Sequence, residues 1–143
     1  MTTNTASATY EGLGKAGKGH ISTGSGALSA QPYGFSTRFE DAAGTNPEEL
    51  VAAAHASCFT MALSFMLAEN GFEDGTLTTS AEVTLEKDGD GFTVTRSALS
   101  TKGTVSGLDK AKFEELADKA KANCPISKLL DCEITLQTEF AAS

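Results

Sequence analysis

The sequence predicts one α+β domain built on an antiparallel sheet, and three stretches of the chain lead to that fold class. Residues 46–71 form a long helix with apolar side chains on every side, and residues 77–105 form a β-hairpin around the turn DGDG. Within residues 106–124 the sequence predicts an amphipathic helix. Because few strands alternate with helices, we expect an antiparallel sheet. The 143 residues contain no repeat or linker, so we expect a single domain over 1–143, with residues 1–5 as a loose tail.

The charge balance narrows the classes of partner. A net charge of −8 and a pI near 4.7 leave no basic stripe for phosphates, which argues against nucleic acid and against anionic membranes. The N-terminus lacks the basic start and apolar run of a signal peptide, so a cytoplasmic location is expected. Thiols stay reduced there, so the three cysteines are not expected to form a structural disulfide framework.

The first forty residues carry one notable cation. Residues 8–23 predict two short strands joined by a Gly-rich turn. After a loop rich in Gly and Pro, residues 35–39 are expected to be extended, with Phe35 and Phe39 facing one way and Arg38 the other. Arg38 is either solvated or held beside an anion by its apolar neighbours.

The central helix has clear boundary signals. Asn46 is a good N-cap, Pro47 suits the first helical position, and Glu49 stands where a capping box places its acid. Because Glu49 takes the capping position, Glu48 has no structural role of this kind. Gly71 is expected to end the helix in the left-handed conformation.

Helical phase suggests what this helix carries. At 100° per residue, one face groups Val51, Ala54, His55, Cys58, Met61, Ala62 and Phe65. Glu48 lies about 80° from Cys58 around the axis, so it can approach the same site. The small residues of 52–57 would let a second subunit's helix come close. The apolar run reaches the lower limit for a bilayer span, but the amphipathic elements around it need it as a core.

The C-terminal third adds a second and a third thiol. Asp109 can cap a surface helix whose apolar stripe is Phe113, Leu116, Ala117 and Ala120. Cys124 precedes Pro125 and is expected to cap a short new helix, where backbone N–H groups and the helix dipole would lower its pKa. Cys132 precedes a last strand over 133–140 and is interpreted as a small buried filler.

Cys58 is open to three interpretations. It could be a buried structural thiol, or a metal ligand with His55, although the further ligands are not evident. As a redox nucleophile it needs a cation to hold the thiolate and a second thiol to resolve the oxidised product. Arg38, oriented by Glu48, and Cys124 are the candidates for these roles.

A family resemblance goes further than these patterns. The segments QPYGFSTRFE, GTNPEELVAAAHASCFTMALSFML and NCPISKLL closely resemble the OsmC branch of the OsmC/Ohr family of peroxide reductases, in the family's order and spacing. The resemblance runs from about residue 7 to residue 140. It implies an intertwined homodimer with long central helices packed between sheets and two active sites at the subunit interface.

The resemblance also implies roles for individual residues. Cys58, in HASCFTMA, matches the cysteine that attacks the hydroperoxide, and Cys124, in CPIS, matches the cysteine that resolves it. Arg38 in STRFE and Glu48 in NPE match the family's arginine and glutamate. Cys132 matches no family motif, so we expect it to be structural.

The implied reaction is a cysteine-based peroxidase cycle in oxidative and osmotic stress defence. Cys58 becomes a sulfenic acid, Cys124 condenses with it to a disulfide, and a dithiol reductant, for example a lipoylated protein, restores both thiols. No metal, flavin or haem is expected as a cofactor. Organic hydroperoxides are favoured over hydrogen peroxide by the apolar side chains Phe39, Phe59, Met61 and Phe65.

Two other functions remain open from the sequence. A non-catalytic redox sensor or thiol-dependent binding protein could use the same Cys58–Cys124 pair to report oxidation. A thiol hydrolase could use Cys58 with His55, although both lie on one helix and a base usually has to come from elsewhere in the fold.

Overall fold

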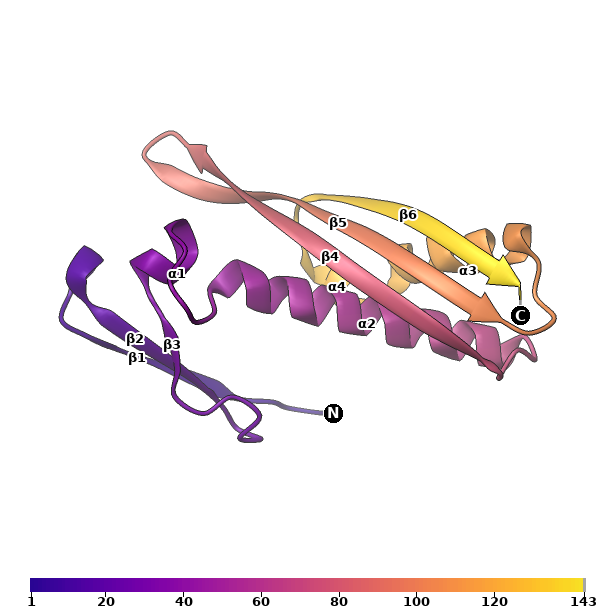
Figure 1. Ribbon diagram of the computed structural model, residues 1–143, viewed down its shortest axis with the longest axis horizontal. Helices are drawn as coiled ribbons and strands as arrows, with labels where there is room; N and C mark the ends of the chain where they lie inside the picture. The colour runs from indigo at the N-terminus through magenta and orange to yellow at the C-terminus, as the bar shows by residue number, and fades with distance from the viewer. Residues whose placement is uncertain (143) are drawn as a thin grey trace. The chain divides into compact units, whose positions relative to one another are not determined.

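The computed structural model describes residues 1–142, which form two compact units divided after Leu50. Figure 1 labels the elements of both units along the chain. Each unit is described by itself below. The expectation of a single domain over 1–143 stays a prediction.

The first unit contains a three-stranded antiparallel sheet in the order β1-β2-β3. Its elements are β1 (Ala6–Glu11), the turn η1 (Gly14–Ala16), β2 (Lys18–Thr23) and β3 (Gln31–Tyr33). The two short strands expected over 8–23 are thus confirmed. Residues 1–5 precede β1 and are exposed, although the Thr5 carbonyl accepts a hydrogen bond from the Gly24 N–H at 2.8 Å.

The segment after β3 is a helix, so the extended conformation expected for residues 35–39 is wrong. The helix α1 spans Phe35–Phe39, and Gly34 donates its N–H to the Thr37 hydroxyl at 2.8 Å. The rings of Phe35 and Phe39 lie 5.1 Å apart between centroids. A spacing of four residues puts two side chains on one face of a strand and of a helix alike, which is why so short a pattern did not separate them.

The second unit contains the sheet β4-β5-β6, with β4 (Gly75–Asp88), β5 (Gly91–Val105) and β6 (Glu133–Ala142). The hairpin of β4 and β5 is confirmed, with Asp88 paired to Gly91 across the DGDG turn. However, β6 pairs with β5 in parallel, so the sheet is mixed and the wholly antiparallel sheet is wrong. The cause is the helical crossover between β5 and β6, which returns the chain to the end where β5 began.

Three helices pack on one face of this sheet: α2 (Pro47–Glu69), α3 (Lys110–Asn123) and α4 (Pro125–Leu129). Inward-facing residues of β5 meet the stripe of α3, which is fully buried as expected. Gly103 is needed at this contact, because a Cβ there would collide with the ring of Phe113. The core consists of Phe59, Leu63, Leu67, Leu99, Val105, Leu108, Phe113, Leu116, Ala117, Ala120 and Cys124.

The ends of α2 are formed by the expected caps. The Asn46 side chain accepts a hydrogen bond from the Glu49 N–H at 2.8 Å. The carboxylate of Glu49 accepts from the Thr45 hydroxyl at 2.7 Å, so it braces the preceding loop. At the other end Gly71 has φ +88°, and Phe72 donates to the Leu67 carbonyl at 2.9 Å, which is a Schellman motif.

The two faces of α2 differ strongly in exposure. His55, Phe59, Leu63 and Leu67 are buried against the sheet and α3. Met61 and Phe65 are each 61% exposed, so in the single chain the helix is not buried on all sides as expected. By length and composition α2 also passes the test for a membrane span, a test that the core helix of a soluble protein passes as well.

Candidate active site

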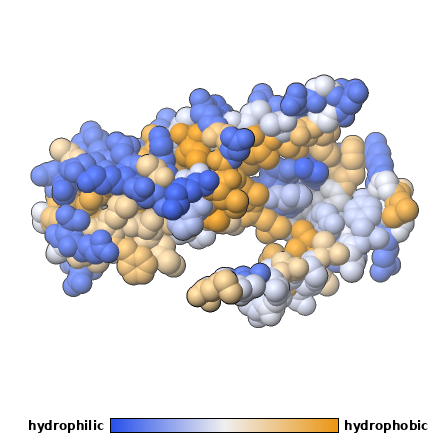
Figure 2. Space-filling view, turned by 180° about the vertical axis from the view of Figure 1, so that it is seen from behind, coloured by the Kyte–Doolittle hydropathy of each residue, from blue (hydrophilic) through white to orange (hydrophobic). Residues whose placement is uncertain are grey.

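Cys58 lies on α2 at the edge between the buried and the exposed face. Its thiol is partly exposed and opens onto a groove of about 530 Å³. The lining is almost wholly apolar: Ala54, Ser57, Cys58, Met61, Ala62, Phe65, Pro125 and Ile126. Figure 2 shows apolar surface, coloured orange, beside strongly hydrophilic surface on the protein. Phe59, which we expected among the walls, lies instead in the core and is fully buried, because it projects from the sheet-facing side of α2.

Cys124 occupies the junction between α3 and α4, as its position before Pro125 predicts. It ends α3 and is the N-cap of α4, where its sulfur accepts a hydrogen bond from the Ser127 N–H at 3.3 Å. The Ser127 hydroxyl lies 3.0 Å from the same sulfur. The Cys124 side chain is only 1% exposed, so these protein groups provide its polar surroundings.

The structure brings Cys58 and Cys124 together. Burial raises the pKa of the Cys58 thiol, a hydrogen bond from the Ile126 backbone lowers it, and the neighbouring Cys124 thiol raises it again. The Cys58 thiol, the Cys124 thiol and the Ile126 backbone therefore meet where α2 passes the start of α4. All three cysteines of the chain are free thiols, and two of them, Cys58 and Cys124, are neighbours here.

Arg38 and Glu48 form a two-pronged ion pair within the first unit. The Arg38 Nη2 atom lies 2.5 Å from Glu48 Oε1, and Nε donates to Oε2 at 3.0 Å. The Glu48 side chain is only 13% exposed, and the Arg38 side chain is 35% exposed. This geometry fixes the plane of the guanidinium. Arg38 is therefore beside an anion, one of the two environments considered from the sequence, and Glu48 has the orienting position suggested for it.

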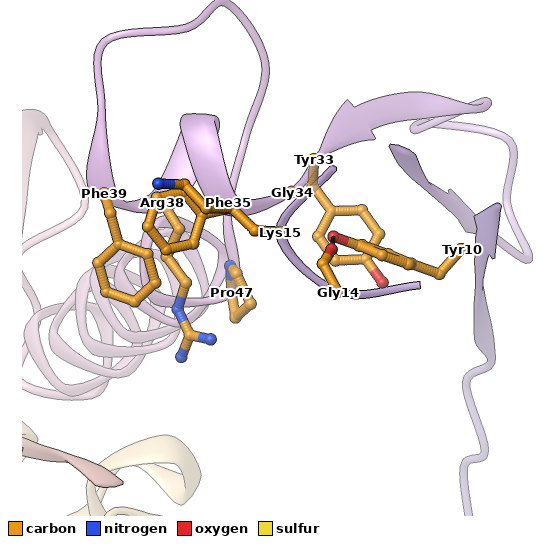
Figure 3. Close-up of a pocket in the computed structure, with 9 residues that line it drawn as sticks. All are labelled: Tyr10, Gly14, Lys15, Tyr33, Gly34, Phe35, Arg38, Phe39 and Pro47. Atoms are coloured by element: carbon orange, nitrogen blue, oxygen red, sulfur yellow. Dashed lines mark hydrogen bonds between the residues drawn. The ribbon is translucent and has the colours of Figure 1, made fainter. Parts of the chain in front are cut away.

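A separate apolar pocket of about 320 Å³ lies beside this ion pair in the first unit. Figure 3 shows the side chains of Phe35, Arg38 and Phe39 near Pro47, with the rings of Tyr10 and Tyr33 at the other end. The Arg38 guanidinium also lies 5.5 Å from the centre of the Phe39 ring. Phe39 lines this pocket of the first unit, and its expected place as a wall of the Cys58 site stays a prediction. The approach of Arg38 and Glu48 to the two thiols stays a prediction.

His55 has surroundings that the sequence did not suggest. It is fully buried, with Nδ1 2.6 Å from the Ser97 hydroxyl and Nε2 2.8 Å from the Ser127 hydroxyl. Burial lowers the pKa of its imidazole. Both ring nitrogens therefore contact serines rather than Cys58, which removes the geometric basis for a hydrolytic Cys58–His55 pair or a shared metal site.

Cys132 is less buried than expected. It precedes β6 and is partly exposed. Burial raises its pKa, a backbone hydrogen bond from Ser97 lowers it, and the charge of Asp131 raises it. The role of Cys132 as a structural thiol stays a prediction.

Comparisons with known proteins identify the fold and its class. The model of the family described as OsmC-like protein matches residues 40–139. The chain is 54% identical over 131 residues to peroxiredoxin OsmC of Escherichia coli strain K12, covering 92% of each chain. It is 31% identical over 123 residues to organic hydroperoxide resistance protein OhrB of Bacillus subtilis, covering 85% of this chain and 88% of OhrB.

Solved structures agree with this fold. The crystal structure of OhrB superposes with a TM-score of 0.66 at 31% identity, over 96% of this chain and 98% of that one. An OsmC-like protein of unknown function from Vibrio cholerae superposes with a TM-score of 0.77 at 20% identity, over 96% and 99%. Together with the relatives above, the fold and the paired thiols define a cysteine-based peroxidase. More particularly, the chain belongs to the OsmC family, as its sequence motifs predicted.

Proposed function

We propose that the protein reduces organic hydroperoxides to alcohols, with Cys58 as the attacking thiol and Cys124 as the resolving thiol. The observation that supports this proposal is the position of Cys58. Its thiol opens onto an apolar groove and also contacts the thiol of the buried Cys124. A hydrocarbon substituent on the peroxide would bury apolar surface against the groove lining at Ala62, Pro125 and Ile126, a stabilisation that hydrogen peroxide cannot gain.

The proposed cycle has three balanced steps. The Cys58 thiolate attacks the outer peroxide oxygen, the O–O bond breaks, and the alkoxide leaves as an alcohol after taking a proton. The Cys124 thiolate then attacks the Cys58 sulfur, its S–O bond breaks, and the hydroxide leaves as water. A dithiol reductant, for example a lipoylated protein, restores both thiols by exchange.

Arg38 and Glu48 have supporting roles in this proposal. The positive charge of Arg38 would stabilise the Cys58 thiolate, offsetting the burial that raises its pKa. Glu48 would hold the guanidinium in one plane through the bidentate pair. No metal, flavin or haem is needed for these steps. The cytoplasm, where dithiol reductants are available, is the proposed location.

We also propose a homodimer, supported by the exposed face of α2. Met61 and Phe65 are both large, apolar and 61% exposed, and small residues such as Ala53 and Ser57 stand beside them on the exposed face. A second copy of α2 would cover this face. Phe65→Asp should lower the mass in sedimentation equilibrium from dimer to monomer, while Phe92→Asp, a change at another exposed phenylalanine on β5, should leave it unchanged. A wild-type protein that sediments as a monomer would refute the homodimer.

The enzymatic proposal is tested by mixing the reduced protein with cumene hydroperoxide and a dithiol and following peroxide loss. Turnover should fall to background in Cys58→Ser and persist in Cys132→Ser, the control thiol. Peptide mapping of wild type oxidised without the dithiol should recover a disulfide between residues 58 and 124. Persistent turnover in Cys58→Ser would overturn the assignment, and oxidation of one equivalent without turnover would favour a sensor.

A further inference from the structure

A chain of hydrogen bonds links His55 to the thiol of Cys124 through the interior of the second unit. Ser97 Oγ lies 2.6 Å from His55 Nδ1, and His55 Nε2 lies 2.8 Å from Ser127 Oγ. The Ser127 oxygen lies 3.0 Å from Cys124 Sγ. The four side chains come from β5, from α2 and from the junction of α3 and α4, so only the folded chain assembles them.

The members of this chain are closed to solvent. His55 and Ser97 are fully buried, Cys124 is 1% exposed and Ser127 is 8% exposed. The thiolate, not the thiol, is the nucleophile in disulfide formation. A proton that leaves Cys124 therefore has to pass to a protein group, and Ser127 is the group whose oxygen contacts the sulfur.

His55 has the chemistry to receive that proton. Burial lowers the pKa of the imidazole and so favours its neutral form, in which one ring nitrogen carries a lone pair while the other carries a hydrogen. With the hydrogen on Nδ1 donated to Ser97, Nε2 can accept from the Ser127 hydroxyl, and Ser127 can accept from the Cys124 thiol. In this arrangement each hydrogen bond donates in the direction from the Cys124 thiol to the His55 imidazole.

We propose that His55 takes the proton of Cys124 through Ser127 and so activates the resolving thiol, a role that rests on the proposed peroxidase cycle. His55 is a positioning residue in this scheme, because Ser127 and not His55 contacts the sulfur. The hydroxyl of Ser127 gives its proton to Nε2 as it takes the thiol proton. The resulting thiolate keeps two donors, the Ser127 hydroxyl and the Ser127 backbone N–H.

The step balances without another reagent. The Cys124 thiolate donates an electron pair to the sulfur of the Cys58 sulfenic acid, an S–S bond forms, and the S–O bond breaks. The hydroxide that leaves becomes water by taking one proton, which balances the proton that Cys124 passed to His55 and that His55 then gives up. The net change is one thiol and one sulfenic acid to one disulfide and water.

The titratable groups near His55 decide which other groups could contribute to a pH profile of its proton transfer. Cys58 lies one turn further along α2, and Cys132 lies at the start of β6 beside Ser97. The charged residues nearest in sequence to these hydrogen-bonded side chains are exposed to solvent: Arg96 on β5, Lys128 on α4 and Asp131 before β6. α3 contributes apolar side chains to this core.

The test separates the two chemical steps of a single turnover. Reduced protein is mixed with one equivalent of cumene hydroperoxide, peroxide loss reports the Cys58 step, and acid quenching with mass analysis reports the disulfide. His55→Gln and Ser127→Ala should leave the rate of peroxide loss unchanged and slow disulfide formation about 10²-fold at pH 7. Ser127→Thr, which keeps the hydroxyl, should restore much of the rate, and Cys132→Ala should match wild type.

The pH profile distinguishes proton transfer from a merely structural role. In the two variants the disulfide rate should rise steeply with pH, because Cys124 then ionises without its internal base, and should approach wild type at alkaline pH. An unchanged disulfide rate at pH 7, or an equal slowing at every pH, would overturn the inference. Absence of peroxide loss in wild type would instead refute the proposed peroxidase function.

A second measurement keeps the inference testable if that function fails or if His55→Gln does not fold. In a Cys58→Ser, Cys132→Ser background, which leaves Cys124 as the remaining thiol, the rate of Cys124 alkylation is followed against pH with and without Ser127→Ala, which removes a single oxygen. The relay predicts that Ser127→Ala slows alkylation of Cys124 at neutral pH and that the two rates converge at alkaline pH. Equal rates at every pH would overturn the proposal.

Discussion

The two faces of α2 have nearly the same apolar composition and opposite environments. Phe59 is fully buried between the sheet and α3, whereas Phe65, less than two turns further on, is 61% exposed. The chain itself covers the first face, and a second copy is proposed to cover the other. Cys58 lies between them, which gives one thiol both a buried partner and access to a groove. The difference teaches that an apolar helix can carry a reactive group at the border between the face that its own chain buries and the face that its own chain leaves exposed.

The largest expected effect, and the most direct test of the difference between the two faces, comes from truncating one phenylalanine on each face. Phe59→Ala should lower the free energy of unfolding by about 3–5 kcal/mol, because it leaves a cavity in a closed core. Phe65→Ala should cost less than about 1 kcal/mol at protein concentrations where the chain is monomeric. Urea denaturation of both variants measures the two values. Equal costs in the monomer would show that the faces are not distinct.

A smaller effect is expected at the border between the faces, where Cys58 titrates. Burial and Cys124 raise the pKa of Cys58, so its alkylation should speed up as the pH rises and the thiolate forms. If Arg38 stabilises that thiolate, Arg38→Ala should move the profile to higher pH and slow alkylation several-fold at neutral pH. Arg38→Lys is the control that keeps the charge without the two-pronged pair to Glu48. Superimposable profiles for wild type and Arg38→Ala would contradict the role of Arg38.

A small effect is also expected at the start of α2, before either face begins. Asn46→Ala removes the cap on the Glu49 N–H and the hydrogen bond that Asn46 donates to the Thr37 carbonyl at 3.1 Å. The expected loss is about 1 kcal/mol of unfolding free energy. Asn46→Asp keeps the capping oxygen but not the donor to Thr37, so it divides the two contributions. A loss as large as that of Phe59→Ala would mean that the cap organises far more than the helix end.

Local signals in the sequence predicted many element boundaries. The caps at Asn46, Asp109 and Cys124 and the glycine at Gly71 are confirmed, because each depends on hydrogen bonds within a few residues of the chain. The stripe of α3 was also read correctly, since its charged residues leave one choice of buried face. The motif around Cys124 led directly to a thiol at a helix start.

The misses have a common physical cause. The five residues of α1 fit two periods equally well, and the direction of β6 depends on where the crossover through α3 and α4 leaves the chain. His55 could not be assigned either, because its partners Ser97 and Ser127 are 42 and 72 residues away. A lone histidine in an apolar run carries no signal of such partners.

The sequence by itself determined the helix ends, the hairpin, the α+β class and, through its motifs, the family and the candidate thiols. Each of these depends on neighbouring residues or on a pattern that repeats along one element. Only the tertiary structure decided which face of α2 is covered, which residues surround Cys58, and that His55 reaches Cys124 through Ser127. A helix that is apolar on every side has no amphipathic phase, so its orientation is set by contacts with distant strands and helices.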